Sequence, residues 1–369
     1  MKQELGYNEP LKAPVNVTWE ITDRCNLQCS HCLSADLRRT CRGDLDFNQC
    51  CRFIDELDAM EVFQINFGGG EPFLREDFVD VLRYAHRKRI TTCVSTNGTV
   101  LDRTLVKNLK KMDLLYLQVS LDGATQETND RIRGKGSYNL ILSGIELLAR
   151  YHIPHLSLNT VVTRSNFREI MQLYELAKTY GAKTRLSRFR PAGDGRRTWI
   201  QHHLDRDQLF ELSSFLGAHK DVLTGDSFFS ITSEDRRDLG LNMCGAAKMT
   251  CSVASDGGIY PCAFLQDERF LSGNVTTESL GSTWHHSPVF RTVRSIAIES
   301  CRNCPRFHLC HGGCPAVAFF LTDSLCYPDP ECLANLREGG GSERERYERM
   351  FATQGKDHTV REMKDAITI

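Results

Sequence analysis

Short apolar runs rich in β-branched residues alternate with longer amphipathic stretches along the first half of the chain. The runs that favour strands are residues 17–21, 63–67, 91–95, 115–120, 155–162 and 184–189. The stretches that favour helices are residues 48–60, 77–87, 102–110, 138–150 and 167–180. Within 138–150, the apolar residues recur close to the helical period. This alternation predicts an α/β fold in which a parallel sheet is covered by helices.

The pattern also divides the chain into successive segments. They are an N-terminal extension (1–15), a core of alternating strands and helices (16–204), a polar, partly helical bridging region (205–240), a cysteine-rich second domain (241–335) and a charged tail (336–369). We expect the tail to be mobile, because it is rich in charge and contains a run of glycines. A length of 369 residues agrees with more than one domain.

Charge and apolar content exclude several kinds of partner. The net charge is −1, which gives no reason to expect binding to nucleic acid or to an anionic membrane. No apolar run approaches membrane-spanning length, and the N-terminus lacks the apolar core of a signal peptide. We therefore expect a cytoplasmic protein. In that reducing compartment, sixteen cysteines favour metal ligation over disulfides.

The first cysteine motif, C-x3-C-x2-C, comes directly after the first strand and comprises Cys25, Cys29 and Cys32. Three thiolates at this spacing can bind a [4Fe–4S] cluster and leave one iron without a protein ligand. That iron can then bind a small molecule. A zinc knuckle could also supply the spacing, so the motif alone is not decisive.

Two further motifs end strand-like runs, Gly68-Gly69-Gly70-Glu71-Pro72 and Ser95-Thr96-Asn97-Gly98. Together with the cysteines they resemble the radical S-adenosylmethionine (SAM) enzymes, in which the open iron chelates SAM and an electron cleaves it to a 5′-deoxyadenosyl radical. The resemblance implies a partial (β/α)6 barrel, whose chemistry gathers at the carboxyl ends of the strands.

The resemblance also implies a set of SAM contacts. They are Gly69, Gly70, Glu71, Asn97, Ser120, Arg133 and Asn159. The Gly-Gly-Glu turn would receive the methionine amino group, the serine would contact the ribose, and the asparagines would line the adenosine pocket. Arg133 would clamp the methionine carboxylate with paired hydrogen bonds.

Plainer interpretations of these residues stay open. The glycines could form an ordinary turn, and the asparagines could only cap strand ends. We prefer Arg133 to Arg131 because it precedes a glycine, as in the family, and Arg131 could be half of a surface ion pair. For His31, between two cysteines, we expect packing over the cluster rather than ligation.

A second set of cysteines lies in residues 241–335 and resembles the SPASM domain, which carries two auxiliary [4Fe–4S] clusters. The resemblance assigns Cys244, Cys251, Cys262 and Cys314 to one cluster, and Cys301, Cys304, Cys310 and Cys332 to the other. The protein would then hold three clusters. Two zinc sites are the alternative, because cysteine spacing does not distinguish the metals.

Five cysteines stand outside these assignments. Cys326 could replace Cys332 as a ligand, although Cys332 matches the family's Pro-Asp-Pro-Glu-Cys ending. For the rest, Cys41, Cys50, Cys51 and Cys93, we expect burial as small hydrophobic residues.

Within the SPASM enzymes, residues 68–72, 223–229, 241–246 and 328–332 resemble the mycofactocin maturases. The resemblance implies a ribosomal precursor peptide ending in Val-Tyr. Its C-terminal tyrosine would be oxidatively decarboxylated, and a carbon–carbon bond would then join valine and tyrosine. The sequence singles out no residue that handles protons on the substrate.

The implied partners are a small peptide-binding chaperone and an external electron donor. About fifteen residues precede the first strand, too few to fold as a chaperone domain, so we expect a separate chaperone. One alternative is a SPASM maturase of another peptide, forming a pyrroloquinoline quinone-type cross-link or a thioether. Another is a non-catalytic iron–sulfur electron carrier, although a carrier needs no SAM pocket.

Overall fold

The computed structural model describes residues 10–334 except 41, 89, 113, 115, 225–227 and 229–243, and it leaves out the side chain of Leu309. The expected tail, most of residues 225–243 and Cys41 lie outside the described residues.

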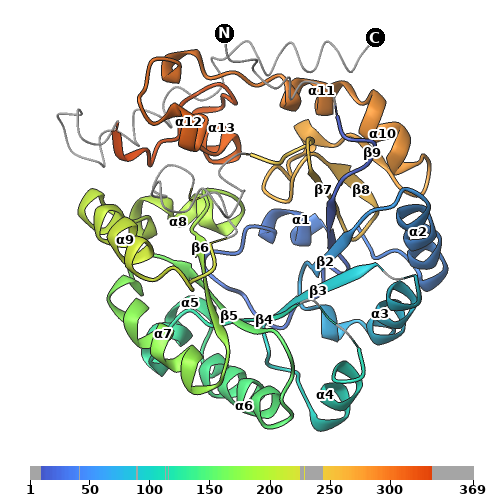
Figure 1. Ribbon diagram of the computed structural model, residues 1–369. Coiled ribbons are helices and arrows are strands. Elements are labelled where there is room, and N and C mark those ends of the chain that lie inside the picture. Colours follow the sequence, from blue (N-terminus) through green and yellow to red (C-terminus); the bar gives the residue numbers. More distant parts are fainter. Residues whose placement is uncertain are drawn as a thin grey trace.

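The centre of the molecule is a curved parallel sheet. Its first six strands are β1 (Asn16–Glu20), β2 (Gln64–Gly68), β3 (Thr91–Thr96), β4 (Tyr116–Ser120), β5 (Leu156–Val162) and β6 (Lys183–Arg188). They lie in the order β6-β5-β4-β3-β2-β1, and each neighbouring pair is parallel. The predicted strands and the partial barrel are confirmed, with helices on the outside (Figure 1).

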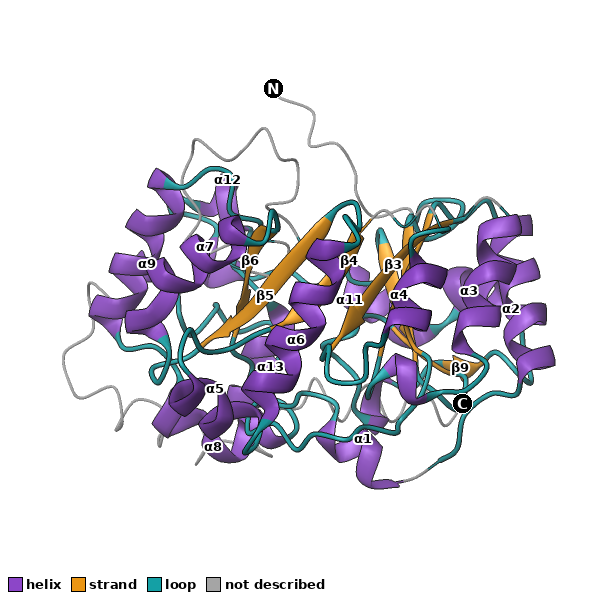
Figure 2. Cartoon of the chain, turned by 90° about the horizontal axis from the view of Figure 1, so that it is seen from below, coloured by secondary structure: helices purple, strands orange, loops and turns teal. Residues whose placement is uncertain are grey.

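Nine α-helices accompany these strands in the part of the chain up to Ala218 that the structure describes. They are α1 (Ala35–Thr40), α2 (Phe47–Ala59), α3 (Phe78–Arg87), α4 (Arg103–Leu109), α5 (Gln126–Arg133), α6 (Ser137–Arg150), α7 (Ile170–Thr179), α8 (Asp194–His202) and α9 (Arg206–Ala218). The sequence analysis missed α1, α5 and α8, because they are short and mostly polar and so lack a long apolar periodicity. Figure 2 shows the strands crossing the middle of the molecule behind the outer helices.

The cysteine-rich region extends the same sheet. Strand β7 (Thr250–Val253) pairs in parallel with β1, and β8 (Gly258–Tyr260) and β9 (Gly273–Asn274) follow in antiparallel order. Val253 and Ile259 belong to the same hydrophobic core as Trp19 of β1. This region therefore shares both sheet and core with the barrel.

Four more α-helices lie in full within the described residues after Ala218, namely α10 (Leu280–His286), α11 (Pro288–Arg294), α12 (Phe307–Cys310) and α13 (Pro315–Thr322). In Figure 1 they gather on the side of the molecule away from α4 and α6. Every residue of α13 is buried, which fits a helix that is apolar on all sides. In the described part of the chain, no helix is long and apolar enough to span a bilayer.

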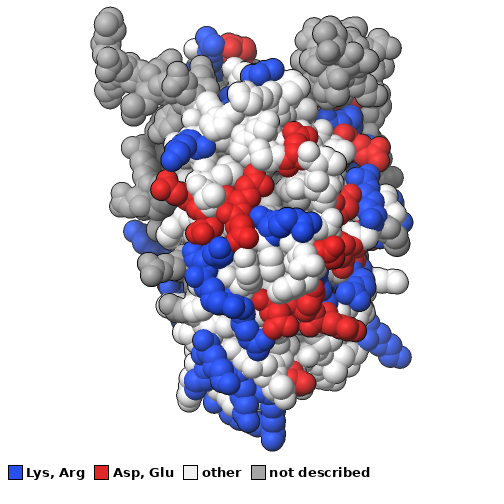
Figure 3. Space-filling model, turned by 90° about the vertical axis from the view of Figure 1, so that its right-hand side faces the viewer, with Lys and Arg blue, Asp and Glu red and all other residues white. Residues whose placement is uncertain are grey.

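The described part of the bridging region packs against the barrel. Leu209, Leu212 and Leu216 of α9 form a second hydrophobic cluster with Tyr174 of α7 and Leu186 of β6. The surface over α2 and α3 mixes positive and negative side chains (Figure 3), in keeping with the small net charge.

Candidate active site

A cavity of about 360 Å³ opens at the carboxyl ends of the strands, and we call it the central cavity. Its lining includes Cys25, Cys29, Cys32, Gly69, Gly70, Asn97, Ser120, Arg133 and Asn159. The structure therefore brings together the first cysteine motif and every predicted SAM contact except Glu71. Carboxyl ends of neighbouring parallel strands meet at one edge, which explains why distant motifs converge there.

The three cysteines of the first motif lie beside two arginines. Arg38 Nη1 is 3.4 Å from the Cys32 sulfur, and Arg133 Nη1 is 3.9 Å from the Cys29 sulfur. Burial raises the pKa of Cys29 to about 11, although the Arg133 charge opposes this. Three thiols with two cations beside them fit an anionic iron–sulfur cluster, because the cations offset the charge of its thiolate ligands.

Arg133, at the end of α5, is held by a buried carboxylate. Its Nε lies 2.7 Å from Asp122 Oδ2, and the same oxygen is 2.5 Å from His31 Nε2. Burial by itself would raise the pKa of Asp122, but Arg133 and His31 outweigh it and hold that pKa below its usual range. Arg131, by contrast, is exposed and pairs with Glu127.

Asp122 was missed by the sequence analysis as a functional residue. The available signal was its place in the Ser120–Gly123 segment, one residue after a buried leucine. Its carboxylate joins the cysteine loop, through His31, to the arginine expected to bind SAM.

Glu71 lies behind the central cavity rather than in its lining. Its carboxylate accepts hydrogen bonds from Thr96 Oγ1 at 2.7 Å and from the Asn97 amide at 2.6 Å. Burial raises the pKa of Glu71, while these two hydrogen bonds oppose the increase. Glu71 thus connects the glycine turn to the loop after β3.

The glycines let this turn pack against the cysteine loop. A Cβ on Gly70 would lie 2.1 Å from the carbonyl oxygen of Arg24, and one on Gly69 would lie 2.6 Å from that of Thr22. The Gly70 amide donates to the Thr22 carbonyl at 2.8 Å. The absence of a side chain is therefore needed for close backbone approach.

The two asparagines line the cavity and also bond to other polar side chains. Asn97 Nδ2 donates to Asn26 Oδ1 at 2.9 Å, and Asn159 Oδ1 accepts from Ser187 Oγ at 2.7 Å. Asn97 directly follows β3, so strand-end capping and a place in the cavity are compatible for it. Asn159 lies within β5 and is paired with β6, so the expectation that it ends its strand is wrong. Ser120 enters the lining from the end of β4.

Glu20, at the end of β1, is a second residue that sequence analysis missed. It lines the central cavity, is 5% exposed and accepts a 2.6 Å hydrogen bond from Ser34 Oγ. Burial raises the pKa of Glu20 to about 7. An acidic residue inside the strand-like run 17–21 was the available signal.

The cysteines of the second set fall into two groups. Burial, with the neighbouring Cys314 thiol, raises the pKa of Cys244 to about 11. The pKa of Cys262 is raised by burial and by the neighbouring thiols of Cys244 and Cys314. The pKa of Cys251 is raised by burial and by the thiol of Cys262. Each of these four thiols is therefore close enough to another to affect its ionisation.

The second group contains Cys301, Cys304, Cys310 and Cys332. Burial and the other three thiols raise the pKa of Cys301 to about 11. Cys326, by contrast, is exposed. Nowhere in the described ranges do three Cys, His, Asp or Glu side chains surround one point closely enough to bind a single metal ion.

The remaining cysteines lie apart from these groups. Cys50 and Cys93 are fully buried, as predicted, whereas Cys51 is partly exposed.

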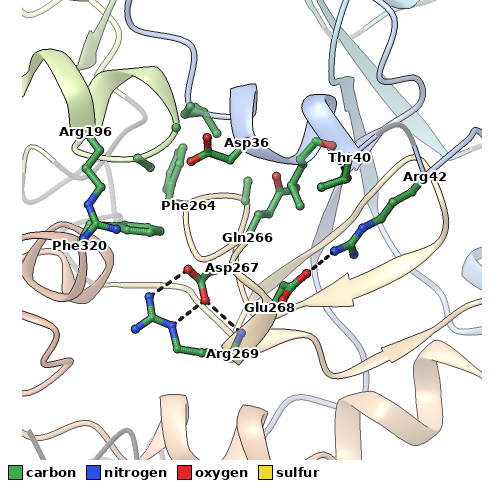
Figure 4. Close-up of a pocket in the computed structure, with 15 residues that line it drawn as sticks. Asp36, Thr40, Arg42, Arg196, Phe264, Gln266, Asp267, Glu268, Arg269 and Phe320 are labelled. Atoms are coloured by element: carbon green, nitrogen blue, oxygen red, sulfur yellow. Dashed lines mark hydrogen bonds and ion pairs between the residues drawn. The ribbon is translucent and has the colours of Figure 1, made fainter. Parts of the chain in front are cut away.

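A second cavity, of about 400 Å³, adjoins the central one, and we call it the outer cavity (Figure 4). Leu33, Ala263 and Phe264 line both, so they form the wall between them. Arg190 stacks on the Phe264 ring, 3.3 Å from its centre. Other lining side chains form ion pairs, such as Arg269 with Asp267 at 2.7 Å and Arg42 with Glu268 at 2.9 Å.

Comparison with known families agrees with this geometry. Residues 19–177 match the radical SAM superfamily, and residues 244–305 match SPASM, an iron–sulfur cluster-binding domain. In fold, the chain is similar to SuiB from Streptococcus suis, whose structure was determined with S-adenosylmethionine bound. The TM-score is 0.71 at 18% identity, over 88% of this chain and 78% of SuiB.

Two relatives are similar over nearly their whole length. The mycofactocin maturase MftC of Mycolicibacterium smegmatis is 38% identical over 96% of this chain and 90% of that protein. MftC of Mycobacterium ulcerans is 39% identical over 89% of this chain and 90% of that protein. With both domain matches in place, the chain belongs to the mycofactocin maturase family of radical SAM/SPASM enzymes.

Proposed function

We propose that this enzyme matures a ribosomal peptide ending in Val-Tyr, by oxidative decarboxylation of the tyrosine followed by valine–tyrosine bond formation. The observation that carries the proposal is the convergence of Cys25, Cys29, Cys32 and Arg133 on one cavity, in a chain similar to MftC over nearly its full length.

In this proposal the three cysteines bind the SAM cluster, and Arg133 binds the methionine carboxylate, with Asp122 orienting the guanidinium. Gly69 and Gly70 place backbone carbonyls near the methionine amino group. The cluster and SAM, when bound, supply a 5′-deoxyadenosyl radical. The chain holds one C–H bond next to that radical and keeps out water and other hydrogen donors.

The first stage consumes one SAM and one electron. The tyrosine gives a hydrogen atom from Cβ to the radical, then loses carbon dioxide and one electron, which leaves an unsaturated, tyramine-like end. In the second stage another SAM is cleaved, a hydrogen atom leaves the valine, and a carbon–carbon bond forms to the modified tyrosine. An electron must return to the peptide to complete that stage.

The second cysteine set serves electron transfer in this scheme. Cys244, Cys251, Cys262 and Cys314 would hold one auxiliary cluster, and Cys301, Cys304, Cys310 and Cys332 the other. Eight thiolates close both clusters, so neither has a free iron for substrate. The proposed partners are the precursor peptide, a separate peptide-binding chaperone and an external electron donor, in the cytoplasm.

An anaerobic assay tests the proposal. The protein is reconstituted with iron and sulfide and mixed with SAM, a reductant, a synthetic precursor ending in Val-Tyr and the chaperone. We expect the peptide to lose carbon dioxide and two hydrogens, with deoxyadenosine formed alongside. Omitting the chaperone should leave turnover poor or uncoupled.

The other outcomes distinguish the alternatives. Deoxyadenosine with an unchanged peptide would indicate another peptide substrate, as for a cross-link or thioether maturase. No deoxyadenosine from a fully clustered protein would indicate an electron carrier. In the control Cys29→Ala, deoxyadenosine formation should disappear, because the SAM cluster loses one of three ligands.

A further inference from the structure

A buried arginine connects the central cavity to the cysteine-rich region. Arg188 ends β6, lines the central cavity and is 4% exposed. Its two terminal nitrogens donate to the two oxygens of Asp329, each at 2.7 Å. Its Nε donates to Glu331 Oε2 at 2.5 Å. One guanidinium therefore binds two carboxylates from a segment more than a hundred residues away along the chain.

Asp329 also holds backbone from both cysteine groups, one through its carboxylate and the other through its own main chain. Its Oδ2 accepts a hydrogen bond from the Cys314 amide at 3.0 Å, and its carbonyl accepts one from the Cys332 amide at 3.0 Å. The Asp329 amide donates to the Gly312 carbonyl at 2.9 Å. Cys314 belongs to the first auxiliary group and Cys332 to the second.

The packing around Asp329 leaves little freedom for adjustment. A Cβ on Gly313 would lie 2.2 Å from the Cβ of Asp329, so the two loops are in direct contact. Asp329 is 1% and Glu331 4% exposed. Burying two carboxylates is costly unless a cation compensates for them, and Arg188 supplies that charge.

We propose that Arg188, through Asp329 and Glu331, is a positioning residue that holds both auxiliary-cluster loops at a fixed separation from the substrate. This inference rests on the proposed function. The electron concerned is the one that the tyrosine-derived radical loses as carbon dioxide leaves. An auxiliary cluster, when held by these cysteines, would accept that single electron, and an external one-electron acceptor would then receive it.

The test compares Arg188→Met, which removes the charge at similar length, with Asp329→Asn and Glu331→Gln. Arg168→Met is the control, because the Arg168 side chain is exposed and its ion pair with Glu211 is long, at 3.9 Å. Each reconstituted protein is first reduced with dithionite, and the electron paramagnetic resonance signal counts its clusters. Hydrogen exchange then measures protection of the amides in residues 310–332.

A single-turnover experiment with SAM, peptide and chaperone follows. The rate of deoxyadenosine formation is measured in the same samples, so that slower SAM cleavage is distinguished from slower electron transfer. In Arg188→Met, reduction of the auxiliary clusters by the substrate, read from freeze-quenched spectra, should slow by roughly tenfold or more, because a small displacement of a reacting group has effects of that size. Exchange in 310–332 should rise by roughly tenfold or more. Arg168→Met should change neither.

Normal cluster reduction and normal exchange in an Arg188→Met protein with full clusters would overturn the proposal. If Arg188→Met loses its clusters, the variants Asp329→Asn and Glu331→Gln are used instead. Normal cluster reduction and normal exchange in both variants would also overturn the proposal. If the wild-type protein leaves the peptide unmodified, the proposed function has failed, and the exchange result alone decides on Arg188.

Discussion

Asp122 illustrates how a residue outside the recognised contacts can organise a site. Its carboxylate lies between His31 of the cysteine loop and Arg133 of α5, and all three side chains are largely buried. A buried carboxylate bonded to an arginine and a histidine fixes their directions more firmly than solvent-exposed pairing does. The position of Arg133 in the cavity therefore depends on Asp122.

Replacing Arg133 separates its role from that of its exposed neighbour. We expect Arg133→Leu to weaken SAM binding by about tenfold to a hundredfold, because a charge-assisted contact is lost. It should also cost about 3 kcal/mol of stability, since the buried Asp122 carboxylate loses its arginine partner. Titration calorimetry and thermal unfolding measure both. Arg131→Leu is the matched control, and equal effects of the two variants would contradict this assignment.

Gly70 offers a second test at this scale. In Gly70→Ala the new Cβ meets the Arg24 carbonyl at 2.1 Å, so the cysteine loop must move, at about 2 kcal/mol. The amount of iron bound per protein should fall, because the cysteine loop is displaced. Gly68→Ala is the control, because nothing lies within 4 Å of its Cβ, and iron retention by Gly70→Ala would show that the loop adapts.

Among the elements, the pairing of β7 with β1 has the largest effect on the arrangement of the sites. Cys251 lies opposite Val17 in this pairing, which brings the cysteine-rich region to the strand that also leads into the loop of the first cysteine motif. The two regions are therefore parts of one sheet. Movement between them would require breaking backbone hydrogen bonds of that sheet.

The loop after α13 contains two cysteines, Cys326 and Cys332, that could complete the second auxiliary group. We expect Cys332→Ser to lose the iron of one cluster and its spectroscopic signal, because Cys332 lies beside Cys301 and Cys310. Cys326→Ser should retain both, since Cys326 is exposed. Loss of iron from Cys326→Ser alone would reverse the assignment. Iron analysis and electron paramagnetic resonance distinguish the two outcomes.

At the scale of the whole molecule, two buried groups act oppositely on pH-dependent stability. Burial raises the pKa of Glu20 to about 7 from 4.5, so the folded state binds the extra proton and stability falls as pH rises. Burial lowers the pKa of His203 to about 4 from 6.5, so the unfolded state binds the extra proton and stability rises with pH. Between about pH 4.5 and 6.5 the two effects oppose each other.

Removing either group should reveal the other. In Glu20→Gln, the free energy of unfolding should rise more from pH 4.5 to 7 than it does in the wild type. The difference between the two proteins should reach about 3 kcal/mol, because each unit of pKa shift contributes about 1.4 kcal/mol. In His203→Gln, stability should rise less over pH 4 to 6.5, by a similar amount. Urea unfolding across this range measures both. His286→Gln, at an exposed site, is the control, and parallel curves for all variants would contradict the linkage.

The sequence by itself determined the six-stranded parallel barrel and the place of its motifs. Strand and helix periodicity depend on local burial, and a motif that follows a strand must lie at its carboxyl end. The position of the cysteine loop was therefore predictable, whereas the choice of Arg133 and the role of each SAM contact came from family resemblance. The short helices α1, α5 and α8 could not be predicted, because they contain few apolar positions.

Only the tertiary structure decided how distant segments meet. Glu71 and Asp122 lie behind the cavity and are defined by contacts to other loops. The pairing of β7 with β1, and of Arg188 with Asp329, joins segments far apart in the chain. Such contacts leave no periodic trace in the sequence, because they depend on which surfaces the folded sheet brings together.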